Sequence, residues 1–152
     1  MMSTLIQVTP WVGVLGMIAA VIAFFGVSKH PAGNKKMQEI ADKIHAGAMV
    51  FLKREYTIIF VFMVIIFIVL ATLLSLWTGI AYLVGAICSG FAGWFGMEAA
   101  TRTGPRACQG AKDGGTAKAL AVAFQGGSVM GLTVAALGVI GLGFFFFFLK
   151  ET

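Results

Sequence analysis

The sequence predicts an all-α, polytopic membrane protein with four transmembrane helices, the second of which extends into the cytoplasm. Of the 152 residues, 59% are hydrophobic and only 11% are charged, whereas soluble domains are about a quarter charged. Charged residues are also absent from three long segments, 1–28, 56–97 and 119–149. Because a span needs about 20 apolar residues, we expect residues 1–152 to form a single transmembrane helical unit.

The uncharged segments predict where the spans lie. The first segment supplies one span, at about residues 5–28, and the last supplies one long or tilted span, at about residues 119–149. The middle segment is long enough for two spans, at about 56–77 and 80–101. We place the break between them at Trp77–Thr78–Gly79, where an interfacial tryptophan adjoins a flexible glycine.

An amphipathic helix is predicted at about residues 35–55, after the turn Pro31–Asn34. Apolar residues recur there at helical spacing, with Glu39, Asp42 and Lys43 between them. Nothing interrupts the pattern before Tyr56, so this helix should continue into the second span. A single helix over residues 35–77 would be about 64 Å long at ~1.5 Å per residue and would project into the cytoplasm.

The basic residues predict the orientation. Of the 11 Lys and Arg residues, all but Lys150 lie between the first and second spans or between the third and fourth. The positive-inside rule then places both loops in the cytoplasm and both termini outside it. The expected location is the cell (inner) membrane. These residues need only flank a bilayer, so we expect no nucleic-acid partner. The loop residues are Lys29, Lys35, Lys36, Lys43, Lys53, Arg54, Arg102, Arg106, Lys112 and Lys118.

Small residues recur at every fourth position in the third and fourth spans. Such stripes allow two helix backbones to approach closely, which favours association in lipid. The sequence therefore predicts helix packing along both stripes, and a substrate path along them is the less favoured interpretation. The stripe of the third span includes Gly85, Ser89 and Gly93, and that of the fourth includes Gly127 and Gly131.

One acidic residue, Glu98, lies at the edge of a span. Intramembrane carboxylates commonly mark function, but Glu98 precedes Arg102 by about one helical turn, the spacing of an ion pair on a helix surface. We therefore predict an ion pair at the membrane interface, and a proton relay is the less favoured alternative. Paired carboxylates and a serine-histidine-acid set are not recognisable, so no catalytic, substrate-binding or metal-binding residue is assigned.

Three blocks carry a more specific pattern. The first, residues 47–56, reads Gly-Ala-Met-Val-Phe-Leu-Lys-Arg-Glu-Tyr; the second includes Gly96–Met97 and Ala99–Arg102; the third is Gly126–Leu132. In this order they resemble the N-terminal portion, with the first four transmembrane helices, of the membrane-bound pyrophosphatases. These are ion pumps driven by pyrophosphate hydrolysis.

Two positions depart from that resemblance. The family usually has Glu where this chain has Ala46, and an Asn-Val-Arg run where this chain reads Gly104-Pro105-Arg106. The second departure puts a specific role of that loop in doubt, but neither affects the expected fold.

The resemblance implies a larger, homodimeric pump that couples cytoplasmic diphosphate hydrolysis to H⁺ or Na⁺ translocation and uses Mg²⁺. The family's catalytic residues follow the fourth helix, so none is carried over to this chain. The composition agrees with this absence of catalytic residues. Several Mg²⁺ ions need many oxygen ligands close together, and the chain has only 6 Asp and Glu residues in total. We therefore expect this chain to hold no cofactor and to be inactive by itself.

The expected partners are the lipid bilayer and the remaining helices of the pump, or another membrane subunit, in a homo-oligomer. The alternative function is a small four-helix transporter or an accessory membrane subunit. Small multidrug exporters share this topology but rely on a carboxylate in the first span, and residues 1–28 contain none. That absence disfavours the exporter class.

Overall fold

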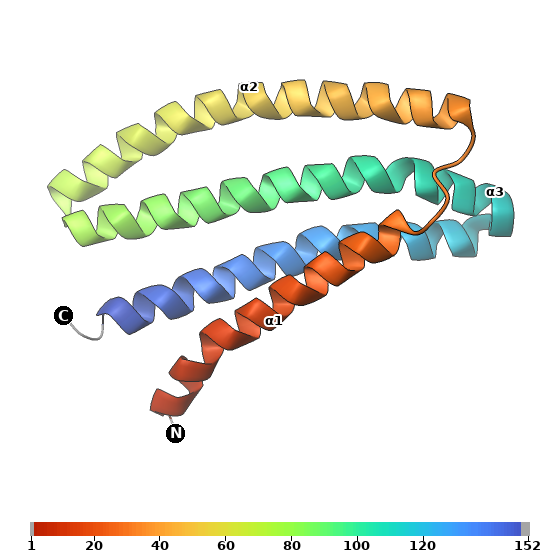
Figure 1. The fold of residues 1–152 in the computed structure, drawn as a ribbon. Coiled ribbons are helices and arrows are strands. Elements are labelled where there is room, and N and C mark those ends of the chain that lie inside the picture. The colour runs from red at the N-terminus through yellow and green to blue at the C-terminus, as the bar shows by residue number, and fades with distance from the viewer. Residues whose placement is uncertain (1, 150–152) are drawn as a thin grey trace.

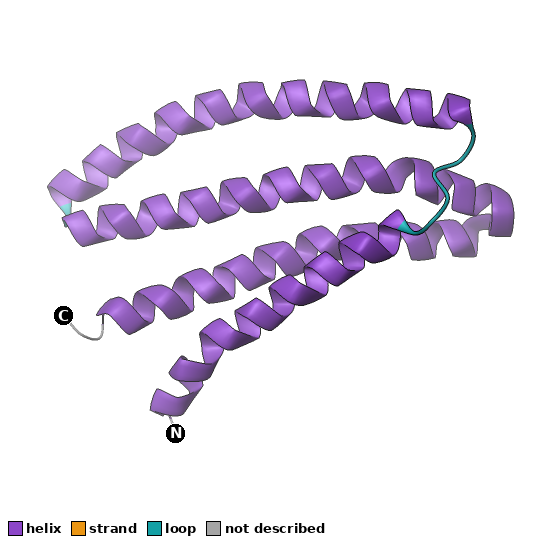
Figure 2. Cartoon of the chain, in the orientation of Figure 1, coloured by secondary structure: helices purple, strands orange, loops and turns teal. Residues whose placement is uncertain are grey.

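The computed structural model describes the backbone of residues 2–149 and the side chains of residues 8–143 and Phe145. It contains three helices, α1 (Met2–Ser28), α2 (Lys35–Leu73) and α3 (Leu76–Leu149), joined by short connections (Figures 1 and 2). The predicted all-α class is confirmed. All three helices are long and apolar enough to cross a membrane.

The 74-residue helix α3 is not one straight rod. Gly114 (φ −152°, ψ 21°) and Gly115 (φ 69°, ψ −165°) leave helical geometry, and the chain reverses direction there (Figure 1). The φ of Gly115 lies in the left-handed region, which glycine adopts without a steric cost. We call residues 76–113 the first arm of α3 and residues 116–149 its second arm.

Helix α3 is the centre of the arrangement, because both other helices pack against it. Figure 1 shows α2 along the first arm and α1 along the second. The 29–34 loop and the bend at Gly114–Gly115 lie at one end of the molecule, which we call the loop end. The 74–75 connection, the start of α1 and the end of α3 lie at the other end, so both charged loops share one end. Lys150 lies outside the described residues.

The start of α2 has a clear local cause. The Asn34 side chain accepts a hydrogen bond from the Met37 backbone N–H at 2.9 Å, which is an N-cap interaction. Gly33 reaches a φ of +87° before it, and Gln38 donates to the Gly33 carbonyl at 2.8 Å. The helix then runs without interruption to Leu73, which confirms that the amphipathic segment continues into the apolar one. Its 39 residues span about 58 Å at ~1.5 Å per residue, well beyond a hydrocarbon core of about 30 Å.

The break predicted at Trp77–Thr78–Gly79 is wrong, because α2 ends at Leu73 and α3 already begins at Leu76. The Ser75 hydroxyl accepts from the Thr78 backbone N–H at 3.2 Å and caps the new helix. Gly79 serves close packing instead of a turn: a Cβ there would lie 3.0 Å from the Phe67 ring. The first arm also continues beyond residue 101, through Pro105, to the glycine bend.

The two arms of α3 meet along a seam of small side chains. Thr103 and Thr133 are buried in it, and their hydroxyls donate to the carbonyls of Ala99 and Val129 at 2.6 and 2.7 Å. Gly126 faces the Thr103 side chain so closely that a Cβ added to Gly126 would overlap it. Gly96 is also buried there, and a Cβ added to it would lie 2.7 Å from the Met130 side chain of the other arm.

Tyr56 ties α2 to the first arm, since its hydroxyl donates to the Gly90 carbonyl at 2.5 Å in a partly buried position. We predict that Tyr56→Phe lowers the free energy of unfolding by about 1 kcal/mol, the usual net value of such a bond. Thermal unfolding of the purified chain in detergent measures this. Tyr82→Phe is the matched control, because no hydrogen bond of the Tyr82 hydroxyl is recorded among the described residues; equal losses for both variants would contradict the prediction.

Candidate functional site

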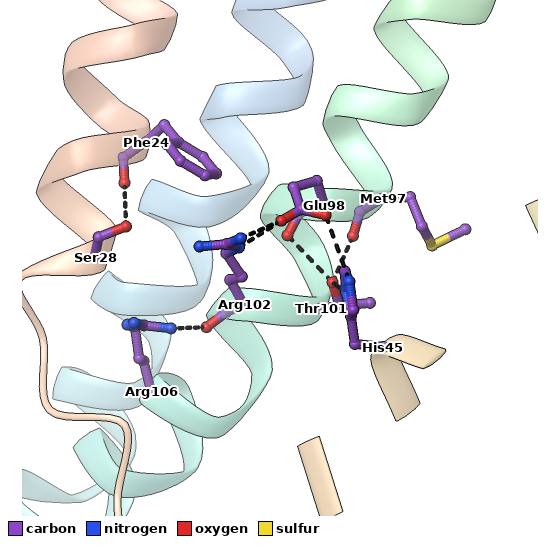
Figure 3. Close-up of polar contacts among 8 residues, drawn as sticks. All are labelled: Phe24, Ser28, His45, Met97, Glu98, Thr101, Arg102 and Arg106. Carbon is purple, nitrogen blue, oxygen red and sulfur yellow. Dashed lines mark hydrogen bonds and ion pairs between the residues drawn. The ribbon is translucent and has the colours of Figure 1, made fainter. Parts of the chain in front are cut away.

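A cluster of polar side chains lies toward the loop end, where α1, α2 and the first arm come together (Figure 3). It contains Glu98, Thr101 and Arg102 from the first arm, His45 from α2 and Phe24 from α1. We call these five residues the Glu98 cluster. The cluster therefore joins three segments that are far apart in sequence.

Glu98 and Arg102 form a close ion pair. Nη2 and Nε of Arg102 lie 2.5 and 2.6 Å from Oε1 of Glu98, and only 14% of the Glu98 side chain is exposed. Two N–H donors on a carboxylate make a strong, oriented interaction. The Arg102 guanidinium also lies 5.8 Å from the centre of the Phe24 ring, a cation–π contact that brings α1 into the cluster.

His45 connects α2 to the same carboxylate. Its Nδ1 lies 2.9 Å from Thr101 Oγ1, and its Nε2 lies 3.7 Å from Glu98 Oε2. The Thr101 hydroxyl also lies 2.9 Å from the Met97 carbonyl, and when it donates there, Nδ1 of His45 is the donor to Thr101. Nε2 then faces Glu98, and protonation of the imidazole would turn this contact into a second ion pair.

Arg106 lies one turn after Arg102 and has a different environment. Its Nη1 donates to the Arg102 carbonyl at 2.5 Å, but its buried Nε has no hydrogen-bond partner within the described structure. Burial, followed by repulsion from Arg102, lowers the pKa of the Arg106 guanidinium from its ordinary value. Arginine nevertheless keeps its proton at neutral pH, so the site holds a charge without a paired carboxylate.

Sequence reasoning identified Glu98 and Arg102 but missed His45, Thr101 and Arg106. His45 and Thr101 are 56 positions apart, and no local spacing relates them. For Arg106, the sequence indicates only a loop charge in a segment that departs from the family pattern. Its spacing of four from Arg102 was available as a signal, because residues four apart share a helix face.

The predicted packing residues lie mostly beside the packed surfaces within this chain. A Cβ added at Gly85, Gly127 or Gly131 would meet nothing within 4 Å of the described atoms. Gly93 does have a close neighbour, since a Cβ there would lie 2.8 Å from the Tyr56 hydroxyl oxygen. Gly85, Ser89 and Gly93 line a groove of about 440 Å³ between the two arms.

The observed seam therefore lies about one residue away from the predicted stripes. Gly96 and Gly126 are buried, whereas Gly85 and Gly127 are exposed. Spacing by four identifies candidate faces, but several faces of a glycine-rich helix satisfy it. Packing of the outward stripes against further helices stays a prediction.

The arrangement does not fit a magnesium or hydrolytic centre. No group of three or more His, Cys, Asp or Glu side chains that could hold a metal ion occurs among the described residues. Mg²⁺ takes oxygen ligands, and the one carboxylate of the Glu98 cluster is already occupied by Arg102. The side chains of the Glu98 cluster instead form charged contacts that connect α1 and α2 to α3.

Comparison with known proteins gives the family. The chain matches the family described as "Inorganic H+ pyrophosphatase" over residues 14–152. It is 45% identical over 120 residues to a putative K⁺-stimulated pyrophosphate-energized sodium pump of Clostridium tetani, covering 79% of this chain and 18% of the relative. It is 39% identical over 142 residues to a K⁺-insensitive pyrophosphate-energized proton pump of Methanosarcina mazei, covering 92% of this chain and 21% of the relative.

A third relative, a K⁺-stimulated pyrophosphate-energized sodium pump of Thermotoga maritima, is 42% identical over 131 residues, covering 84% of this chain and 18% of the relative. The chain thus spans about a fifth of the length of these relatives, in their N-terminal portion. Sodium pumps and a proton pump match to a similar degree. The chain therefore belongs to the inorganic H⁺ pyrophosphatase family and is a multi-pass membrane protein.

Proposed function

We propose that this chain is the N-terminal membrane part of a pyrophosphate-hydrolysing pump for H⁺ or Na⁺. The observation that carries the proposal is the family match over residues 14–152, together with the similarity to pumps about five times as long as this chain. In this role the chain contributes helices and a cytoplasmic projection, and the remaining part of the pump contributes hydrolysis. The scarcity of carboxylates supports this division, since the chain has 6 Asp and Glu residues and several Mg²⁺ ions with diphosphate need more oxygen ligands.

The proposed topology has four spans: α1, the apolar part of α2, and the apolar part of each arm of α3, at about residues 80–101 and 119–149. The reversal at Gly114–Gly115 supports two spans within α3. The loop end is assigned to the cytoplasm, because all Lys and Arg residues except Lys150 belong to the two charged segments that meet there. Both termini then lie outside, and residues 35–55 of α2 project into the cytoplasm.

The partners in this proposal are lipid, the remaining helices of the pump and a second copy of the pump. The exposed stripe containing Gly127 and Gly131 supports contact with further helices, because small residues let backbones approach. Exposed apolar side chains along α2, such as Phe60, Phe62 and Ile65, support lipid contact in the middle of that helix.

The test is complementation in trans. A sodium-pump relative lacking the portion equivalent to this chain is expressed alone, with this chain, or with an unrelated four-helix membrane protein. We expect Mg²⁺-dependent pyrophosphate hydrolysis in vesicles only in the second case, and background hydrolysis from vesicles that contain this chain alone. Failure of rescue where the intact relative is active would count against the proposal. Clear hydrolysis by the chain alone would refute the division of labour.

A further inference from the structure

A second feature near the Glu98 cluster is a polar cavity of about 330 Å³ between the 29–34 loop, the start of α2 and the first arm. Arg102 and Arg106 line it from α3, and Gln38, Asp42 and His45 line it from α2. We call it the arginine cavity. Glu98 is not among its lining residues, so the carboxylate that neutralises Arg102 lies outside it.

The charges around the arginine cavity are unbalanced. Within the described structure no carboxylate lies within 4.0 Å of Arg106, and Asp42 on the facing wall forms no ion pair with it. Arg102, one helical turn earlier, adds a second positive charge that repels Arg106. A partly buried cation without a counter-charge is costly, and an anion in the cavity would remove that cost.

The hydrogen bonds are incomplete in the same place. The buried Nε of Arg106 has no hydrogen-bond partner among the described residues, and buried polar groups are normally satisfied by protein, water or an ion. Arginine presents its N–H groups as a planar fork that matches phosphate oxygens. Phosphate chemistry therefore suits the charge of Arg106, which has no counter-ion within the described structure.

We propose that the arginine cavity binds a phosphate-type oxyanion, held by Arg106 and Arg102 and opposed by Asp42. The ligand is inorganic phosphate or the phosphate headgroup of an anionic lipid, since the cavity lies at the loop end, beside the expected membrane surface. This site is separate from pyrophosphate hydrolysis and does not depend on the pump assignment.

The first experiment titrates orthophosphate into the purified full chain in uncharged detergent and follows binding by calorimetry. Saturable binding is expected, and Arg106→Gln should weaken it about tenfold or more, as for loss of hydrogen bonds to a charged group. Arg106→Lys keeps the charge but loses the planar fork, so it should retain part of the affinity. The matched control is Arg54→Gln, because Arg54 is exposed on α2 and does not line the cavity.

The second experiment places the chain in phosphatidylcholine nanodiscs with or without phosphatidic acid and measures thermal stability. Stabilisation by phosphatidic acid that Arg106→Gln abolishes, without binding of orthophosphate, would identify the lipid headgroup as the source. Absence of binding in both experiments, or equal losses of affinity in Arg106→Gln and Arg54→Gln, would overturn the proposal.

Asp42→Asn keeps the test informative if Arg106→Gln fails to fold. Removing the opposing carboxylate should tighten anion binding about threefold or more, in line with a charge several ångströms away in a wet site. A purely structural role for Arg106 does not predict this gain. Unchanged or weaker binding in Asp42→Asn would overturn the proposal.

Discussion

Gly126→Ala should destabilise the protein by about 1–3 kcal/mol, the usual cost of overfilling a packed interface. A Cβ at Gly126 would overlap Oγ1 of Thr103 and lie 2.7 Å from its Cβ. Thr103 is 6% exposed and its hydroxyl is bonded to Ala99, so it cannot move aside without losing that bond or shifting the helix. Thermal unfolding in detergent should show the loss as a lower midpoint.

Gly127→Ala is the control for that prediction. It adds the same methyl group one residue further along the same helix, where no described atom lies within 4 Å of the new Cβ. Because alanine is the better helix former by about 1 kcal/mol in water, this variant should be neutral or slightly more stable. Equal destabilisation by the two substitutions would contradict the seam as the tight contact between the arms.

Glu98→Gln should lower the free energy of unfolding by about 1.5–3 kcal/mol, as for hydrogen bonds to charged groups. The substitution removes the negative charge that faces Arg102 at 2.5 Å and His45 at 3.7 Å. Since 14% of the Glu98 side chain is exposed, water replaces these contacts poorly. The loss should appear in thermal unfolding, and it should be smaller in Arg102→Lys, which keeps a cation.

The same chain supplies a control at equal spacing. Glu39 and Lys43 also form an i,i+4 ion pair, at 3.0 Å, but their side chains are 67% and 75% exposed. Exposed pairs of this kind contribute a few tenths of a kcal/mol, so Glu39→Gln should change stability by less than about 0.5 kcal/mol. A loss as large as that of Glu98→Gln would mean that burial is not what strengthens the Glu98 pair.

The all-α class and the run of α2 from the amphipathic segment into the apolar one were predictable, because both depend on composition and local periodicity. The end of α2 was not. Trp77 and Gly79 formed the stronger local signal, yet Ser75 caps α3 and Gly79 packs against Phe67. A glycine permits either a turn or a close contact, and only the neighbouring helix decides between them.

Sequence by itself determined the helical class, the membrane character and the grouping of charge into two segments. It also brought Glu98 and Arg102 onto one helix face, because residues four apart are neighbours wherever a helix forms. The tertiary structure decided which face of each helix is buried, placing Gly126 instead of Gly127 in the seam. It also decided that His45 meets Thr101 and that Arg106 borders a cavity. These outcomes depend on how one helix is rotated against another. The sequence leaves that rotation open, because small residues recur at every fourth position on more than one face of the helix.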